Sequence, residues 1–294
     1  MKSQTRCGHH RKQIRKISWG KMLETPRCRK ASSLSIGPMS LFLSPIKTIS
    51  STTQRRKSDS RLERRLQFDL SDVDPRTIHL FHHLPEAPKV EAPEIGGPRR
   101  DREYTLVLDI DETLVHCSSD PSLPYVFEIE VIPENHSNST PRKYYVRKRP
   151  NIDYFLQEVA QHFEVIAFTA GYKRYANRIL DYLDPEGTIF SHRLYRDSCY
   201  IKDRKYIKNL NALGRDLNKT ILVDNSIEAL GFQMDNGLLI KTWTSDPYDD
   251  QLLLVLDILS NILLVQASVP RYLRDQFGLS RFIEHQIDLL HQHH

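Results

Sequence analysis

Cysteines are few in this sequence, and none of them forms a recognisable pair. Cys7, Cys28, Cys117 and Cys199 contain no CxxC motif and no spacing typical of a metal site. A disulfide framework or a structural zinc site needs such spacings, so neither is indicated. The cysteines fit free thiols in a reducing compartment.

Long hydrophobic runs are also missing. The most apolar segment, from Leu252 to Val265, is 14 residues long and therefore too short to span a bilayer. Its polar members Asp257, Ser260 and Asn261 share one face of a helix, which is typical of an amphipathic helix that faces the core. We therefore expect no membrane span.

Acidic residues are scarce at the N-terminus. Residues 1–65 contain 17 Lys and Arg but three acidic residues, whereas residues 66–294 contain 25 basic and 34 acidic residues. This basic arm is rich in Ser and Thr and poor in aromatics, so it buries too little apolar surface to offset its ordering entropy. A segment with four prolines and Gly96-Gly97 follows it and reads as a linker. We predict a disordered arm and linker over residues 1–102 and one globular domain over 103–294.

Extended and helical patterns alternate within the predicted domain. Apolar runs predict strands at 105–109, 164–168, 220–224 and 237–243, and helical patterns lie at 151–162, 172–183 and 250–265. This alternation is typical of an α/β fold, in which helices cover both faces of a parallel sheet. Two extended segments, 125–132 and 144–147, are joined by a polar loop and predict a small β insertion.

Two carboxylates follow the first predicted strand. Asp109 and Asp111 belong to the run Asp-Ile-Asp-Glu-Thr, which ends at Thr113. Ligands of open α/β sheets bind beyond the carboxyl ends of the strands, so both acids can face one ligand. One carboxylate can attack an electrophile while the other manages a proton, and the threonine hydroxyl can bond a phosphoryl oxygen. The alternative is a solvated acidic turn, which the preceding apolar strand disfavours.

Further polar residues follow two other predicted strands. Thr169 comes after the strand at 164–168, and a threonine at a strand end can bond a phosphate oxygen or simply act as a cap. Asp224 and Asn225 end the strand at 220–224, and their oxygens suit Mg²⁺ unless they only form a turn. Lys208 could offset the negative charge of such a site, although a lone lysine is usually a solvated charge.

The segment from Val107 to His116, Val-Leu-Asp-Ile-Asp-Glu-Thr-Leu-Val-His, resembles the signature of the FCP-homology phosphatases. These belong to the haloacid-dehalogenase (HAD) superfamily and include the small phosphatases of the RNA polymerase II C-terminal domain and the Dullard-type phosphatases. The resemblance extends from about Tyr104 to about Glu284 and includes four motifs in the same order. It implies a HAD-like, doubly wound parallel sheet with a small β insertion after the first motif.

The resemblance also implies roles for individual residues. Asp109 would be the nucleophile and Asp111 the general acid and base, while Thr169 and Lys208 would bind the transferring phosphoryl group. Mg²⁺ would be held by the Asp109 carboxylate, the Asp111 carbonyl and the Asn225 side chain. Thr113 and Arg196 would bind the substrate. Asp224 would support Lys208 and the waters on the metal.

Two departures from the family pattern stand out. Ile227 replaces a usual proline after Asn225-Ser226, which should affect the loop more than the chemistry. Ser119 stands where the small phosphatases place a phenylalanine in a pocket for a substrate proline. The second change puts the polymerase tail in doubt as the substrate.

We therefore expect a Mg²⁺-dependent protein serine/threonine phosphatase that forms an aspartyl-phosphate and acts on the RNA polymerase II C-terminal domain or another nuclear phosphoprotein. The alternative is a catalytically silent FCP-homology binding module, such as a mitochondrial translocase receptor. A glycosyltransferase that uses Asp-x-Asp for its metal ranks last, because it explains neither Thr169 nor Lys208.

The arm leaves the compartment open. Its Arg and Ser content resembles a transit peptide, and the basic clusters 55–57 and 61–65 equally resemble a nuclear-localisation segment or a weak nucleic-acid contact. We expect a monomer in the nucleus or cytoplasm, with the mitochondrion as the alternative.

Overall fold

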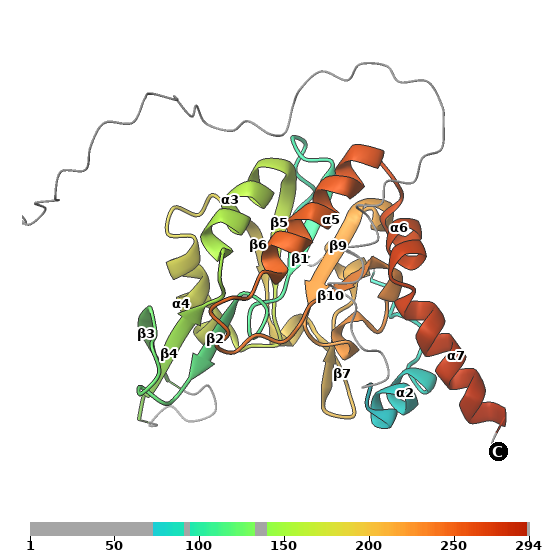
Figure 1. The fold of residues 1–294 in the computed structure, drawn as a ribbon, viewed down its shortest axis with the longest axis horizontal. Coiled ribbons are helices and arrows are strands. Elements are labelled where there is room, and N and C mark those ends of the chain that lie inside the picture. The colour runs from blue at the N-terminus through green and yellow to red at the C-terminus, as the bar shows by residue number, and fades with distance from the viewer. Residues whose placement is uncertain (1–72, 91–94, 133–139, 293–294) are drawn as a thin grey trace, which may run out of the picture. The chain divides into compact units, whose positions relative to one another are not determined.

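The computed structural model describes residues 73–90, 95–132 and 140–292 (Figure 1). The predicted basic arm therefore lies outside the described residues. Among the residues that are described, no helix has the length and apolar character needed to cross a membrane.

A parallel sheet of five strands forms the centre of the fold, in the order β10-β9-β1-β5-β6. The strands are β1 (Tyr104–Leu108), β5 (Phe163–Phe168), β6 (Phe190–Leu194), β9 (Thr220–Asp224) and β10 (Gly237–Leu239). The four predicted strands are confirmed, although β10 ends at Leu239 rather than at residue 243. Prediction missed β6, because three polar residues occupy its middle and obscure the apolar run.

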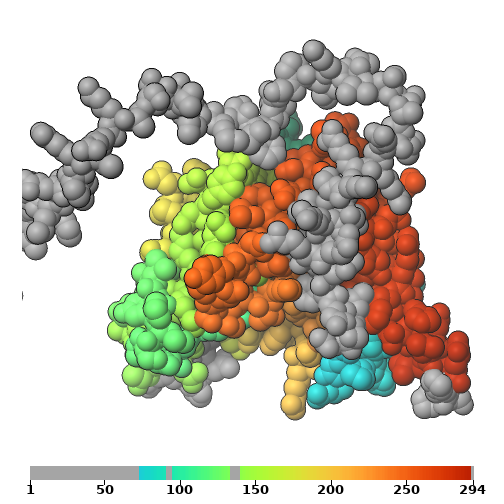
Figure 2. All heavy atoms as spheres, in the orientation of Figure 1, coloured from blue at the N-terminus to red at the C-terminus, as the bar shows by residue number. Residues whose placement is uncertain are grey.

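Successive residues of β1 point to opposite faces of this sheet and enter two separate hydrophobic clusters. Leu106 and Leu108 join the cluster formed with α3 (Ile152–His162), α4 (Lys173–Leu183) and α5 (Gln251–Val265). Val107 joins the cluster on the other face, which includes α2 (Pro75–His82) and α7 (Leu279–Gln292). The predicted doubly wound arrangement is thus confirmed, because helices bury both faces. Figure 2 shows α3 and α5 side by side over the first face.

The helix α3 illustrates how the sequence sets the packing. Its buried residues are Ile152, Phe155, Leu156 and Val159, a spacing that puts them on one face of a helix. The helices predicted at 151–162, 172–183 and 250–265 occur close to these bounds as α3, α4 and α5. Within the described residues, the other helices are α6 (Val269–Gln276) and short 3₁₀ turns at Arg196–Ser198, Leu210–Leu213, Leu217–Lys219, Glu228–Leu230 and Met234–Asn236.

The predicted β insertion is an antiparallel sheet in the order β2-β4-β3. Its strands are β2 (Val115–Ser118), β3 (Phe127–Val131) and β4 (Arg142–Lys148). Prediction identified β3 and β4 but not β2, which directly continues the first motif. The Phe127 ring stacks on the Tyr182 ring of α4 at 3.6 Å between centroids, so the insertion is fixed to the core beside the first motif.

The prediction of an unstructured linker is wrong for the residues of α2. Asp74 caps this helix by accepting from the Arg76 N–H at 2.8 Å, and Ile78, Leu80 and Phe81 are buried. The segment after α2 is also tied to the domain, because the Asn209 side chain donates to the Pro88 carbonyl at 3.0 Å. The proline content concealed these contacts, which depend on residues more than 100 positions away.

A buried ion pair joins two further parts of the chain. Arg215 donates to both carboxylate oxygens of Glu164, at 2.7 and 2.6 Å, and to the Gly96 carbonyl at 2.8 Å. Burial acts to raise the pKa of Glu164, but the hydrogen bonds and charge of Arg215 outweigh burial, so the pKa is lowered. The pair therefore stabilises the fold above the ordinary Glu pKa and loses that contribution as the pH falls through the lowered folded value.

Replacing Arg215 by methionine tests this pair. Arg215→Met leaves the buried Glu164 carboxylate without its main partner, which should lower the free energy of unfolding by about 3–5 kcal/mol. Urea denaturation at pH 7 measures the loss, and the difference from the unmodified chain should shrink towards pH 4. The control is Arg193→Met, whose exposed pair with Asp181 should cost at most about 1 kcal/mol. Equal losses in the two variants would show that the buried pair stabilises the fold no more than the exposed one.

Candidate active site

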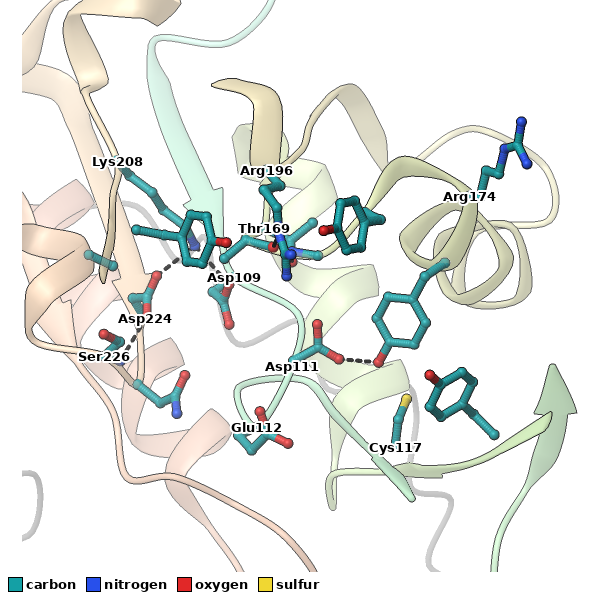
Figure 3. Close-up of a pocket in the computed structure, with 18 of the residues that line it drawn as sticks. Asp109, Asp111, Glu112, Cys117, Thr169, Arg174, Arg196, Lys208, Asp224 and Ser226 are labelled. Atoms are coloured by element: carbon teal, nitrogen blue, oxygen red, sulfur yellow. Dashed lines mark hydrogen bonds and ion pairs between the residues drawn. The ribbon is translucent and has the colours of Figure 1, made fainter. Parts of the chain in front are cut away.

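Three neighbouring strands place polar residues at one edge of the central sheet. Asp109 follows β1, Thr169 follows β5, and Asp224 ends β9. The order of these strands changes direction at β1, which is where open α/β sheets bind their ligands. A pocket of about 800 Å³ opens there (Figure 3). Nearly all residues expected from the sequence line it, namely Asp109, Asp111, Thr169, Arg196, Lys208, Asp224 and Asn225.

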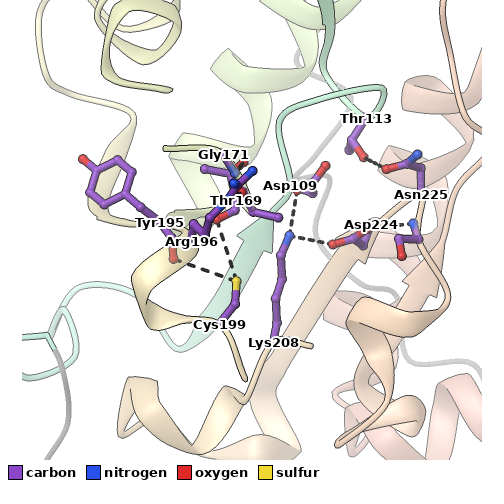
Figure 4. A network of polar contacts seen from close by, with 12 residues as sticks. Asp109, Thr113, Thr169, Gly171, Tyr195, Arg196, Cys199, Lys208, Asp224 and Asn225 are labelled. Carbon is purple, nitrogen blue, oxygen red and sulfur yellow. Dashed lines mark hydrogen bonds and ion pairs between the residues drawn. The ribbon is translucent and has the colours of Figure 1, made fainter. Parts of the chain in front are cut away.

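Lys208 lies at the base of this pocket between two carboxylates (Figure 4). Its ammonium donates to Asp109 at 2.7 Å and to Asp224 at 2.6 Å, and all three side chains are buried. Burial acts to lower the pKa of the Lys208 ammonium, but the two carboxylates together outweigh burial, so the pKa is raised. The lysine therefore remains charged and occupies one oxygen of Asp109, which leaves the other oxygen for chemistry in the pocket.

Asp111 is held by a residue that the sequence did not reveal. The Tyr175 hydroxyl of α4 donates to one oxygen of the Asp111 carboxyl (Figure 3). Burial raises the pKa of Asp111 to about 7, while the hydrogen bond from Tyr175 acts in the opposite direction. A carboxyl group with such a pKa can both donate and accept a proton near neutral pH.

Thr169 begins a short turn that places small residues beside the carboxylates. Its hydroxyl accepts from the Gly171 N–H at 2.9 Å. A Cβ at position 171 would lie 3.2 Å from the Thr169 hydroxyl and 3.2 Å from the Tyr175 ring, so a larger residue would crowd both. The glycine thereby leaves room for the Thr169 hydroxyl and the Tyr175 ring beside the pocket.

Thr113 does not line the pocket, contrary to the position expected of a residue that contacts substrate. It is fully buried, and its hydroxyl donates to the Asn225 side-chain oxygen at 3.2 Å. The Asn225 amide nitrogen donates to Thr242 at 3.1 Å. These two bonds fix the orientation of the Asn225 amide group. A direct contact between Thr113 and substrate stays a prediction that the geometry does not favour.

The groups near Asp109 form a donor set that suits Mg²⁺. One carboxylate oxygen of Asp109 is not used by Lys208, and the Asn225 oxygen has a second lone pair beyond its bond from Thr113. Hard cations take such oxygens together with waters. Within the described ranges, no group of three or more His, Cys, Asp or Glu could hold a metal ion. A carboxylate oxygen and an amide oxygen would therefore hold a hard cation together with waters.

Comparison with known proteins matches this domain to one family. The family described as NLI interacting factor-like phosphatase matches residues 104–269. The chain belongs to this family. Membership confirms the resemblance to the FCP-homology phosphatases.

Individual relatives agree with this assignment. CTD small phosphatase-like protein 3 of Caenorhabditis elegans is 37% identical over 219 residues, covering 73% of this chain and 72% of that protein. CTD small phosphatase-like protein 2 of Dictyostelium discoideum is 41% identical over 65% of this chain but 33% of its own length. CTD nuclear envelope phosphatase 1B of Danio rerio is 38% identical over 52% of this chain and 64% of its own length. The structure of Fcp1, an RNA polymerase II CTD phosphatase, matches with a TM-score of 0.42 at 21% identity, over 61% of this chain and 54% of that chain.

Several pocket residues of this family member were not expected from the sequence. Tyr175 and Cys117 lie beside Asp111, and burial raises the pKa of the Cys117 thiol to about 12, which makes it a poor nucleophile. The only available signal for Tyr175 was its position six residues after Thr169, in the first turn of α4. A tyrosine at such a position usually packs in the core, so the pattern did not distinguish the two roles.

A second polar network connects α2 to the loop after β9. Glu228 accepts from Thr77 at 3.0 Å, from Lys205 at 2.6 Å and from Ser226 at 2.9 Å. The Ser226 N–H in turn donates to Asp224 at 2.8 Å. The loop contains Ile227 in place of the usual proline, and these bonds restrain it instead. The helix α2, which prediction assigned to the arm and linker, thus supports Asp224, which binds Lys208.

A double-mutant cycle tests the link between α2 and this loop. Thr77→Val removes the buried hydrogen bond to Glu228 and should lower the free energy of unfolding by about 1–2 kcal/mol. In a Glu228→Met background the same change should cost less than about 0.5 kcal/mol, because the acceptor is already absent. Thr77→Ser keeps the hydroxyl and should recover most of the loss. Equal costs of Thr77→Val in both backgrounds, measured by urea denaturation, would disprove the coupling.

Proposed function

We propose that the chain is a Mg²⁺-dependent protein serine/threonine phosphatase that works through an aspartyl-phosphate. The observation that carries this proposal is the arrangement of Asp109, with one oxygen bound by Lys208 and the other facing a pocket that also contains Asp111. A nucleophile needs a free oxygen and a fixed direction, and Lys208 supplies the second of these.

The first step forms a bond between the free Asp109 oxygen and phosphorus. The bond from phosphorus to the serine or threonine oxygen breaks, and Asp111 gives its proton to the departing oxygen. In the second step Asp111 takes a proton from a water molecule, whose oxygen attacks phosphorus. The bond to Asp109 then breaks, and phosphate leaves. In this proposal the Lys208 ammonium and the Thr169 hydroxyl, which line the same pocket, bind the phosphoryl oxygens during both steps.

The proposed ligands of Mg²⁺ are the Asp109 carboxylate, the Asp111 carbonyl and the Asn225 side chain, with Asp224 as support. When bound, the ion would neutralise negative charge on the phosphoryl oxygens. Few protein ligands and several waters make such binding weak and reversible.

The substrate is proposed to be a nuclear phosphoprotein. Support comes from relatives named for the CTD and for the nuclear envelope. Ser119 is exposed and stands where the small phosphatases place a phenylalanine, so we favour a protein other than the polymerase tail. The nuclear or cytoplasmic location, the monomeric state and a weak contact of the basic arm with nucleic acid stay predictions.

The second candidate is a silent binding module, and metal removal separates it from an enzyme. A chelator should abolish hydrolysis of p-nitrophenyl phosphate by the full chain, and excess Mg²⁺ should restore it, because the proposed ligand set holds the ion weakly. The measurement is p-nitrophenolate release before and after dialysis against the chelator. Hydrolysis that never appears with any divalent ion would favour the binding module, and hydrolysis that survives exhaustive chelation would refute the metal dependence.

The two carboxylates should fail in different ways. Asp109→Asn removes the nucleophile, so neither a burst nor turnover should appear with any substrate. Asp111→Asn should slow phosphoserine peptide turnover roughly 10²–10⁴-fold, because a serine alkoxide needs the proton of the acid. A nitrophenolate leaves without much help, so this variant should still give a burst of p-nitrophenolate.

Rapid-mixing absorbance and phosphate release measure these outcomes. The burst of the Asp111→Asn variant should equal about one nitrophenolate per active site, followed by slow turnover, because the same residue assists hydrolysis of the phosphoenzyme. Two variants with the same behaviour on both substrates would show that the roles are wrongly assigned.

A further inference from the structure

The mouth of the pocket carries more positive charge than one phosphate requires. Lys208 donates to Asp109 and Asp224 at the base of the site, where the scissile phosphate is proposed to bind. Further out, arginines from separate elements line the same pocket: Arg142 from β4, Arg174 from α4, Arg196 from a 3₁₀ turn and Arg204 from the turn between β7 (Tyr200–Lys202) and β8 (Lys205–Ile207). Their positions suggest a role beyond the scissile phosphate.

Arg196 is held in place without losing its charge. Its Nε donates to the Ala170 carbonyl at 2.6 Å, and its guanidinium carbon lies 3.8 Å from the centre of the Tyr172 ring. The Tyr206 ring lies at 4.8 Å from the same carbon. Stacking fixes the plane of the guanidinium, and its hydrogen-bond partner is a neutral carbonyl. The group is therefore ready to bind an anion with little further loss of entropy.

Arg204 occupies a backbone conformation that arginine does not favour. It and Asp203 form the two-residue turn of the β7–β8 hairpin, with φ of 64° and 49°. Two-residue hairpin turns of this kind normally contain Asn or Gly, because both positions of the turn need positive φ. A strained residue retained beside a pocket points to a function for its side chain.

Arg174 is also placed against its local electrostatic preference. It lies in the first turn of α4, which contains no acidic residue. The helix dipole disfavours a cation at this end. The side chain is exposed, and among the described residues no carboxylate forms an ion pair with it. Neither helix stability nor a salt bridge explains this arginine.

We propose that Arg174 and Arg204, which line the same pocket as Arg196, bind a second anionic group of the substrate. The preferred substrate class is then a peptide with a second phosphoserine, phosphothreonine or acidic cluster near the scissile phosphate. This inference rests on the proposed phosphatase function. The scissile phosphate lies at Asp109, so its charge is met by Lys208 and leaves the outer guanidinium groups for a neighbouring anion.

The test compares peptides of one sequence with one or two phosphates. The second phosphoserine is placed two to five residues to either side of the scissile one, because an extended chain advances about 3.3 Å per residue. For the best doubly phosphorylated peptide, kcat/KM should exceed that of the singly phosphorylated peptide by about tenfold at low salt. The advantage should fall as salt shortens the Debye length.

Variants of the full chain then identify the responsible groups. Arg174→Ala and Arg204→Gly should each reduce the ratio of the two kcat/KM values by roughly two- to fivefold, and the double variant should bring it close to one. Glycine at position 204 favours the positive φ of the turn, so this variant should keep the hairpin while it loses the guanidinium. The matched control is Arg178→Ala on the same helix, which does not line the pocket and should leave the ratio unchanged.

The outcomes separate this inference from the proposed function. A wild-type chain that hydrolyses both peptides equally well refutes the second anion subsite but keeps the phosphatase. A chain that hydrolyses no phosphomonoester refutes the phosphatase itself. An unchanged ratio in the double variant would assign the preference to other residues and overturn the proposal.

Discussion

The Lys208 ammonium is the charge on which the rest of the site depends. Asp109, Asp111 and Asp224 come from two adjacent strands and their following loops, and their carboxylates would repel one another in a buried site. A single buried cation at 2.7 and 2.6 Å from two of these acids offsets that repulsion. It also sets the direction of Asp109. The same interaction therefore reduces the repulsion between the buried carboxylates and orients Asp109, the proposed nucleophile.

The support of this cation extends well beyond the sheet. Asp224 is held by the Ser226 N–H, Ser226 by Glu228, and Glu228 by Thr77 of α2. On the other side of the pocket, Tyr175 of α4 holds Asp111, and the stack of Phe127 on Tyr182 joins the insertion to that helix. Lys208 is thus paired with two carboxylates. Within the described residues no ion pair involves Arg174 or Arg204, and this contrast separates the proposed chemistry from the proposed recognition.

The fold could be predicted where one local pattern decided the structure. The apolar runs of β1, β5 and β9 and the i, i+3, i+4 spacing in α3 are local signals, and the elements occur close to the expected residues. Prediction failed for β6, whose polar middle hides its run, and for α2, a short helix between the basic arm and the proline-rich segment that was included in the predicted arm and linker. Both elements are stabilised by partners distant in sequence, which no local pattern contains.

For the site, the sequence by itself determined the identity and order of the expected residues: two acids after one strand, a threonine after the next, a lysine, and an acid with an amide. Only the tertiary structure decided which of them meet. It turned Thr113 towards Asn225 instead of the pocket, brought Tyr175 to Asp111, and joined Thr77 to Glu228 across 151 residues. Hydrogen bonds and burial depend on distance in space, and sequence spacing fixes that distance only within a strand, a helix or a turn.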